Sequence, residues 1–87
     1  MTTRSYRVKS SEGLHARPAT TLAKIANQYD NAIHIEYDGK RIDLKSVIGV
    51  MSLGIASKET FSITVEGNNS ETIHHDFETV LKENHII

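Results

Sequence analysis

The chain has 87 residues, of which 38% are hydrophobic, and this length suits one domain with a modest core. Its 10 basic and 11 acidic residues leave a net charge of −1, which excludes a nucleic-acid interface built on bulk positive charge and favours proteins or small molecules as partners. Cysteine is absent, which excludes disulfides and thiolate metal sites, and no apolar run approaches the roughly 18 residues of a membrane span. We expect one soluble, cytoplasmic domain over residues 1–87.

A strand and a helix are predicted in the first third of the chain. Tyr6 and Val8 alternate with charged residues, which is typical of a half-buried strand. From Ala16 onward apolar residues recur at steps of three and four, which predicts an amphipathic helix that stops at Asp30-Asn31. The apolar positions of this helix are Ala19, Leu22, Ala23, Ile25, Ala26 and Tyr29.

Two strands and a short helix are predicted next. Apolar residues alternate over residues 33–37 and again at Ile42 and Leu44, and Asp38-Gly39 between them is a strong signal for a two-residue hairpin turn. Ser46 then provides a good N-cap for a short helix.

The last third predicts one more strand and one more helix. Apolar and polar residues alternate over residues 61–65, and Gly67 and Asn68 break the strand. Asn68 and Glu71 have the spacing of a capping box, which predicts that a helix opens there. The apolar face of this helix is formed by Ile73, Phe77, Val80 and Leu81.

The predicted element order, β-α-β-β-α-β-α, favours an α/β (α+β) fold of two layers, in which helices cover one face of a small antiparallel sheet. The alternation in each strand agrees with this fold, because a parallel sheet buried on both faces would read as continuous apolar runs.

The segment Gly13-Leu14-His15-Ala16-Arg17-Pro18-Ala19-Thr20 carries most of the functional information. It puts His15 where a loop enters a helix, and the free N–H groups and positive dipole end of a helix N-terminus favour an anion. His15 is therefore a candidate for carrying a phosphoryl group, and the alternative is a histidine that only caps the helix. We expect a ring nitrogen of His15 to act as the nucleophile.

The neighbours of His15 fit the same chemistry. Gly13 permits a sharp turn into the loop, and Arg17 is a bidentate donor for phosphate oxygens. Pro18 suits the first helical turn, and we expect it to hold Arg17 outside the helical region.

The 13–20 segment, together with Asp43-Leu44-Lys45-Ser46-Val47-Ile48-Gly49-Val50-Met51-Ser52-Leu53-Gly54-Ile55, closely resembles the HPr family, the histidine-containing phosphocarriers of the bacterial sugar phosphotransferase system. The resemblance covers essentially the whole chain. It implies an open-faced sandwich with sheet order 1-4-2-3 and three helices on one face. It also implies that enzyme I, charged by phosphoenolpyruvate, phosphorylates Nδ1 of His15, and that the phosphoryl group passes to enzyme IIA domains without a metal or organic cofactor.

The resemblance implies a second functional residue and a docking surface. In Gram-positive members an ATP-dependent kinase phosphorylates the serine that matches Ser46, and the modified protein is a corepressor of a catabolite control protein. The alternative is that Ser46 is only a helix cap. Enzyme I and enzyme IIA would dock on a surface that comprises Thr20, Lys24, Val47, Ile48 and Met51.

Three features depart from the family pattern. Glu12 replaces a small polar residue, and an acid there would repel a phosphoryl group. The turn at Ser57-Lys58-Glu59 lacks a glycine. The last helix, with His74 and His75, and the tail over residues 84–87 are atypical, and we interpret them as parts of a solvated face.

Three alternatives to the phosphocarrier are open. A regulatory paralogue similar to Crh would act mainly through phosphorylated Ser46, but Crh has glutamine where this chain has His15. A metal-binding module fits poorly, because His74 and His75 point about 100° apart on a helix and His85 lies about 16 Å from His74 along the axis. A plain interaction module of ferredoxin-like shape is compatible with the element order alone.

Overall fold

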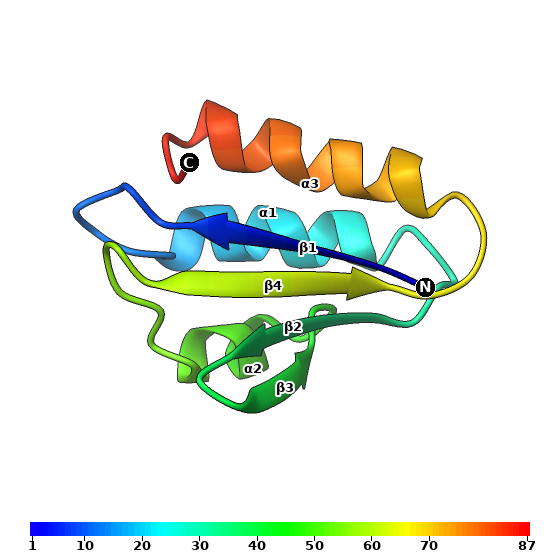
Figure 1. Ribbon diagram of the computed structural model, residues 1–87, viewed down its shortest axis with the longest axis horizontal. Helices are drawn as coiled ribbons and strands as arrows, with labels where there is room; N and C mark the ends of the chain where they lie inside the picture. Colours follow the sequence, from blue (N-terminus) through cyan, green and yellow to red (C-terminus); the bar gives the residue numbers. More distant parts are fainter.

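The computed structural model describes residues 1–87 as four strands and three helices (Figure 1). In chain order the elements are β1 (Thr2–Arg7), α1 (Ala16–Ala26), β2 (Ile33–Tyr37), β3 (Lys40–Asp43), α2 (Val47–Ser52), β4 (Thr60–Val65) and α3 (Ser70–Glu83). The strands form one antiparallel sheet in the order β1-β4-β2-β3. The predicted fold, element order and sheet order are therefore confirmed.

The alternation in the strands separates a polar face of the sheet from an apolar one. On the open face, Thr3 bonds to Thr64 and Ser5 bonds to Ser62, each pair through side-chain oxygens 2.8 Å apart. On the other face the sheet packs against the helices around a core of 20 buried hydrophobic residues, whose largest fully buried side chains are Phe61 and Phe77. α3 is the longest helix at 14 residues, and none of the helices combines the length and apolar composition needed to cross a lipid bilayer.

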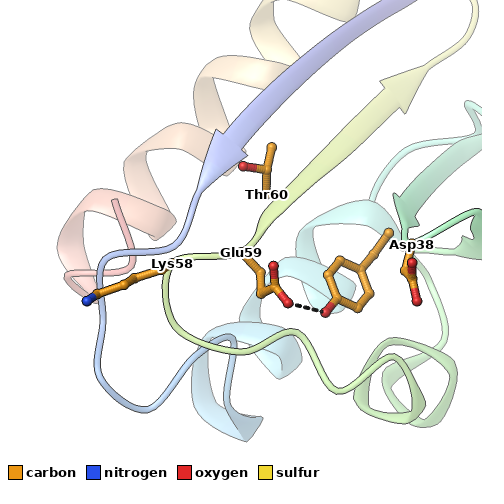
Figure 2. Close-up of a pocket in the computed structure, with 5 residues that line it drawn as sticks. Asp38, Lys58, Glu59 and Thr60 are labelled. Atoms are coloured by element: carbon orange, nitrogen blue, oxygen red, sulfur yellow. Dashed lines mark hydrogen bonds between the residues drawn. The ribbon is translucent and has the colours of Figure 1, made fainter.

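The predicted hairpin and the turn before β4 lie side by side (Figure 2). Asp38 and Gly39 both have positive φ, at 51° and 76°, as a two-residue hairpin turn of the predicted type requires. The turn that lacks a glycine places Lys58 at φ 71°, and its N–H donates to the Val8 carbonyl at 2.7 Å. The Tyr37 hydroxyl donates to a Glu59 carboxylate oxygen at 3.1 Å. The pKa of Tyr37 is raised, mainly by desolvation of its hydroxyl and secondly by this hydrogen bond.

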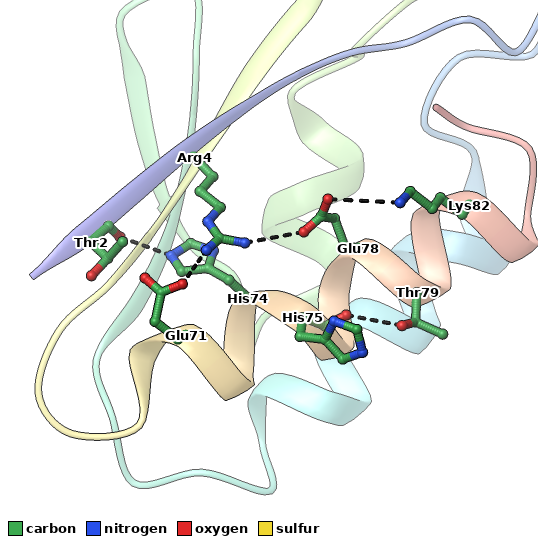
Figure 3. A network of polar contacts seen from close by, with 8 residues as sticks. All are labelled: Thr2, Arg4, Glu71, His74, His75, Glu78, Thr79 and Lys82. Atoms are coloured by element: carbon green, nitrogen blue, oxygen red, sulfur yellow. Dashed lines mark hydrogen bonds and ion pairs between the residues drawn. The ribbon is translucent and has the colours of Figure 1, made fainter.

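α3 is tied to β1 by a polar network (Figure 3). Arg4 forms ion pairs with Glu71 and Glu78, the second at 3.1 Å. His74 is fully buried, and its Nε2 donates to the Thr2 carbonyl at 2.9 Å while its Nδ1 has no partner. His75 points to the other side of the helix and is exposed.

The expectation of a solvated face was therefore wrong for His74 and for part of the tail. His74 follows the core residue Ile73 and faces edge strand β1, whose carbonyl provides the acceptor that a buried imidazole needs. Ile86 in the tail is fully buried and belongs to the core.

Two predicted helix ends also differ from the structure. α3 is preceded by Asn69, which has φ 62° and makes no side-chain capping bond, so the capping box of Asn68 and Glu71 was wrong. The Asn31 amide holds this turn instead, by donating to the carbonyls of Glu66 and Asn68 at 2.7 Å each.

α1 ends at Ala26, four residues before the predicted stop at Asp30. The backbone N–H and the side-chain amide of Asn27 both donate to the Ala23 carbonyl, and this amide also donates to the Lys45 carbonyl. The next two backbone bonds, from Gln28 N–H to the Ile25 carbonyl and from Tyr29 N–H to the Ala26 carbonyl, span three residues instead of four, so the α-helical pattern ends before the apolar pattern is complete. Tyr29 then packs against the core from the turn.

Candidate functional site

His15 occupies the N-cap position of α1 but does not cap the helix. Its backbone is extended, with φ −83° and ψ −179°, and its side chain accepts no hydrogen bond from the first turn. The imidazole Nδ1 lies 3.3 Å from the Gly13 carbonyl oxygen, and the side chain is 30% exposed. The first turn contains no acidic residue, so its free backbone N–H groups remain available to an external anion.

The loop that presents His15 is fixed by Gly13 and Leu14. Gly13 has φ +68°, and a Cβ atom on it would lie 2.4 Å from the Ile55 carbonyl oxygen. The same oxygen accepts a hydrogen bond from the Leu14 N–H at 3.0 Å. A glycine is therefore required here both by the backbone angle and by the close approach of the Ile55 carbonyl.

Gly13→Ala should lower the free energy of unfolding by on the order of 2 kcal/mol, because it combines a left-handed alanine with a backbone clash. Gly39→Ala is the matched control, since Gly39 also has a positive φ but a Cβ there meets nothing within 4 Å. Urea unfolding of both variants would measure the difference. Equal destabilisation would show that the Ile55 contact contributes nothing.

Arg17 lies inside α1, whose first residue is Ala16, so the expectation that Pro18 holds it outside the helical region was wrong. The preference that proline imposes on the preceding residue is overcome here, because the Ala19 N–H donates to the His15 carbonyl at 3.2 Å and closes the first turn. The Arg17 side chain is exposed and forms no ion pair or hydrogen bond within the chain. Its guanidinium is therefore free to bind a ligand.

His15 and Arg17 line one polar cleft of about 450 Å³. The cleft has no hydrophobic lining, and its remaining walls are formed by Ser10, Glu12, Glu83, Asn84 and His85. The C-terminal end of α3 lies at the same end of the molecule as the start of α1 (Figure 1), and residues of both ends line the cleft. A Glu12 carboxylate oxygen lies 3.7 Å from His15 Nε2, so Glu12 approaches the imidazole itself.

Sequence reasoning missed four residues of this cleft: Ser10, Glu83, Asn84 and His85. The last three were assigned to the final helix and its tail, and no periodicity or motif in the sequence relates the tail to the loop before α1. The cleft is a product of tertiary packing, and the place of Glu83 and of a second histidine in it becomes visible only in the structure.

Ser46 is the N-cap of α2, as predicted. Its backbone is extended, and its Oγ accepts a hydrogen bond from the Gly49 N–H at 3.0 Å. A Cβ on Gly49 would lie 2.6 Å from a methyl carbon of Ile42, so this glycine lets the helix start close to β3. Ser46 is exposed, and its hydroxyl is therefore accessible from solvent.

The residues predicted for docking are exposed or half-buried on α1 and α2. Thr20 and Lys24 are exposed and follow Arg17 at steps of three and four, so they share one face of α1. Ile48 is 84% exposed and Met51 is 41% exposed, while Val47 is half-buried. A six-residue helix that buries Val50 cannot also bury Ile48, and the result is an exposed apolar patch.

The chain matches the family model described as the phosphotransferase-system HPr component phosphorylation site over residues 2–83. Among solved structures, it is similar to the histidine-containing phosphocarrier protein of Mycoplasma, at 29% identity and a TM-score of 0.93, with 99% of this chain and 98% of that chain covered. It is 34% identical to the phosphocarrier protein HPr of Bacillus anthracis, with a TM-score of 0.80 and 91% and 94% of the two chains covered. Crh of Bacillus subtilis is 26% identical, with a TM-score of 0.70 and 95% of each chain covered. With its fold, its histidine at an open helix mouth and these matches, the chain belongs to the HPr family of phosphocarrier proteins.

Proposed function

We propose that this protein accepts a phosphoryl group from phospho-enzyme I on His15 and passes it to enzyme IIA domains in the cytoplasm. The observation that carries the proposal is His15 itself, which stands at the mouth of α1 without capping it and shares a polar cleft with the unpaired Arg17. A histidine placed only to cap a helix would make the capping bond, and His15 does not.

The proposed reaction exchanges one N–P bond for another. A ring nitrogen of His15 attacks the phosphorus of the phosphohistidine on enzyme I, and the enzyme I imidazole leaves with its electron pair. Such a transfer needs positioning and stabilisation of the charge on the phosphoryl oxygens more than covalent help. The N–H groups of the first turn of α1 and the Arg17 guanidinium supply both. The donor, the acceptor and these contacts complete the reaction without a metal or organic cofactor.

The proposal is tested by incubating the protein with phosphoenolpyruvate and enzyme I and measuring its mass under acidic and basic conditions. We expect one added phosphoryl group that is lost in acid and retained in base, because phosphohistidine is acid-labile. A protein that gains no phosphoryl group, or gains one that is stable in acid, would refute the carrier function.

Ser46 supports a regulatory role in the same proposal. Its exposed Oγ caps α2, and a phosphate on an N-cap residue is favoured by the free N–H groups of the helix behind it. An HPr kinase/phosphorylase would modify this hydroxyl, and a catabolite control repressor would recognise the product. The apolar residues of the docking surface follow Ser46 directly, so a charge of roughly −2 would stand beside the surface that enzyme I must contact.

Phosphorylation of Ser46 should therefore weaken docking through charge. Ser46→Asp should raise the apparent KM for this protein in the enzyme I reaction by a few-fold, and by more at low salt, because salt screens the repulsion. Ser46→Asn is the matched control, since asparagine also caps a helix but carries no charge. The rate of phosphoryl transfer against protein concentration, at two ionic strengths, measures the effect. If the rate curves of Ser46→Asp and Ser46→Asn coincide, a charge at this position does not affect docking and Ser46 only caps α2.

The second candidate is a mainly regulatory protein similar to Crh, whose printed name refers to catabolite repression. This candidate is considered because Crh has the same fold and is 26% identical to this chain. The presence of His15 in an open cleft favours the carrier. The two functions are separated by the same experiment, since a purely regulatory protein would accept phosphate on Ser46 from ATP but none from phosphoenolpyruvate.

A further inference from the structure

α3 ends in a conformation that usually requires glycine. The His85 N–H donates to the Lys82 carbonyl at 3.0 Å, and the Ile86 N–H donates to the Leu81 carbonyl at 2.8 Å. These two bonds define a Schellman motif, whose first residue beyond the cap adopts a left-handed backbone and is most often glycine. In this chain that residue is His85, with φ 58°.

Nothing in the packing of α3 explains a histidine at this position. Ile86, the next residue, is fully buried and supplies the apolar contact of the motif, whereas His85 is exposed. The His85 imidazole forms no hydrogen bond or ion pair within the chain. Left-handed backbone conformations of residues other than glycine cluster at functional sites, so the conformation of His85 suggests a functional role for its side chain.

The His85 side chain lines the same cleft as His15 and Arg17. A phosphoryl group on His15 brings a charge of about −2 into this cleft, by analogy with other phosphorylated side chains. The fixed charges there are two carboxylates, Glu12 and Glu83, and a single guanidinium, Arg17. Carboxylates are acceptors only, so Arg17 is the one fixed-charge side chain of the cleft that can donate to phosphoryl oxygens.

Asn84 and Ser10, the neutral polar side chains of the cleft, each already have a hydrogen-bond partner within the chain. The Asn84 amide donates to the Val80 carbonyl at 2.9 Å, and Ser10 Oγ accepts a hydrogen bond from the Glu12 N–H at 3.2 Å. His85 and Arg17 are the two nitrogen-bearing side chains of the cleft that make no hydrogen bond or ion pair within the chain.

We propose that His85 is a phosphoryl-binding residue, whose ring N–H donates to the phosphoryl oxygens on His15. This inference rests on the proposed function and deepens it. Arg17 binds the group from the start of α1, and His85 binds it from the end of α3. The left-handed backbone of His85 is less favourable for histidine than for glycine. In this proposal the fold tolerates that cost because it places an imidazole at that end of the cleft.

The test compares His85→Gly and His85→Asn with the unmodified protein. Glycine and asparagine both tolerate a left-handed backbone, so neither variant should be less stable, and His85→Gly should melt at a higher temperature. We nevertheless expect both variants to lose about tenfold in kcat/KM for phosphoryl transfer from enzyme I, the size expected for a lost hydrogen bond to a charged group. The 31P resonance of the phosphorylated protein should also shift in both variants.

His75→Asn is the matched control, because His75 is an exposed histidine of α3 that lies outside the cleft, and it should change neither the transfer rate nor the 31P resonance. A normal transfer rate and an unshifted 31P resonance in both His85 variants would overturn this inference alone. Failure of the unmodified protein to accept a phosphoryl group would refute the proposed function, so the two failures are distinguishable.

Discussion

His15→Ala should abolish phosphoryl incorporation from phosphoenolpyruvate and enzyme I. His15 is the one histidine at a helix mouth with an unpaired arginine beside it, and none of the other residues of the cleft combines a ring nitrogen with that position. Phosphoryl incorporation is measured from the mass of the intact protein under basic conditions, in which phosphohistidine is stable. The fold should survive, because the His15 side chain makes no capping bond whose loss would weaken α1.

The melting temperature of His15→Ala checks that the loss is chemical, and we expect it to change little. His75→Ala serves as a second control, since it removes an exposed histidine of α3 and should leave labelling complete. If His15→Ala still incorporates a full phosphoryl group, the group is carried by another residue and His15 is not the acceptor.

Arg17→Ala should reduce kcat/KM for phosphoryl transfer from enzyme I by roughly 30- to 1,000-fold. This range corresponds to the loss of about 2 to 4 kcal/mol of stabilisation when one preorganised charged donor is removed from a transition state. The free energy of unfolding should change by less than about 0.5 kcal/mol, because the Arg17 side chain is exposed and unpaired and alanine is a good helix former.

Arg17→Lys separates charge from geometry. Lysine keeps the positive charge but lacks the planar fork that binds two phosphate oxygens at once, so its rate should lie between those of the arginine and alanine forms. Stopped-flow or quench measurements with limiting enzyme I give all three rates. An unchanged rate in Arg17→Ala would show that the backbone N–H groups of α1 suffice for transfer.

The sequence predicted the fold well because its signals are local and agree with each other. Strand alternation, the Asp38-Gly39 turn and the Ser46 cap each specify one element, and the structure contains each of them where it was expected. The position of His15 directly before a helix was predicted for the same reason, whereas Arg17 was expected outside this helix and lies inside it.

The errors concern contacts between segments far apart in the chain. The burial of His74 depends on the Thr2 carbonyl, 72 residues away, and no local pattern signals that acceptor. Where α1 ends, the Asn27 amide donates to the Lys45 carbonyl, 18 residues away, and no local pattern signals that contact either. The cleft that joins His15 to His85 has the same origin, because it forms only when α3 packs beside α1.

The most direct measurement of the carrier function follows one phosphoryl group through both transfers. The protein is phosphorylated with phosphoenolpyruvate and catalytic enzyme I, separated from both, and then mixed with an enzyme IIA domain while the masses of both proteins are recorded in base. We expect one phosphoryl group to leave His15 and appear on the enzyme IIA domain. A phosphorylated protein that keeps its group, or loses it only to water, would contradict a role as a phosphocarrier.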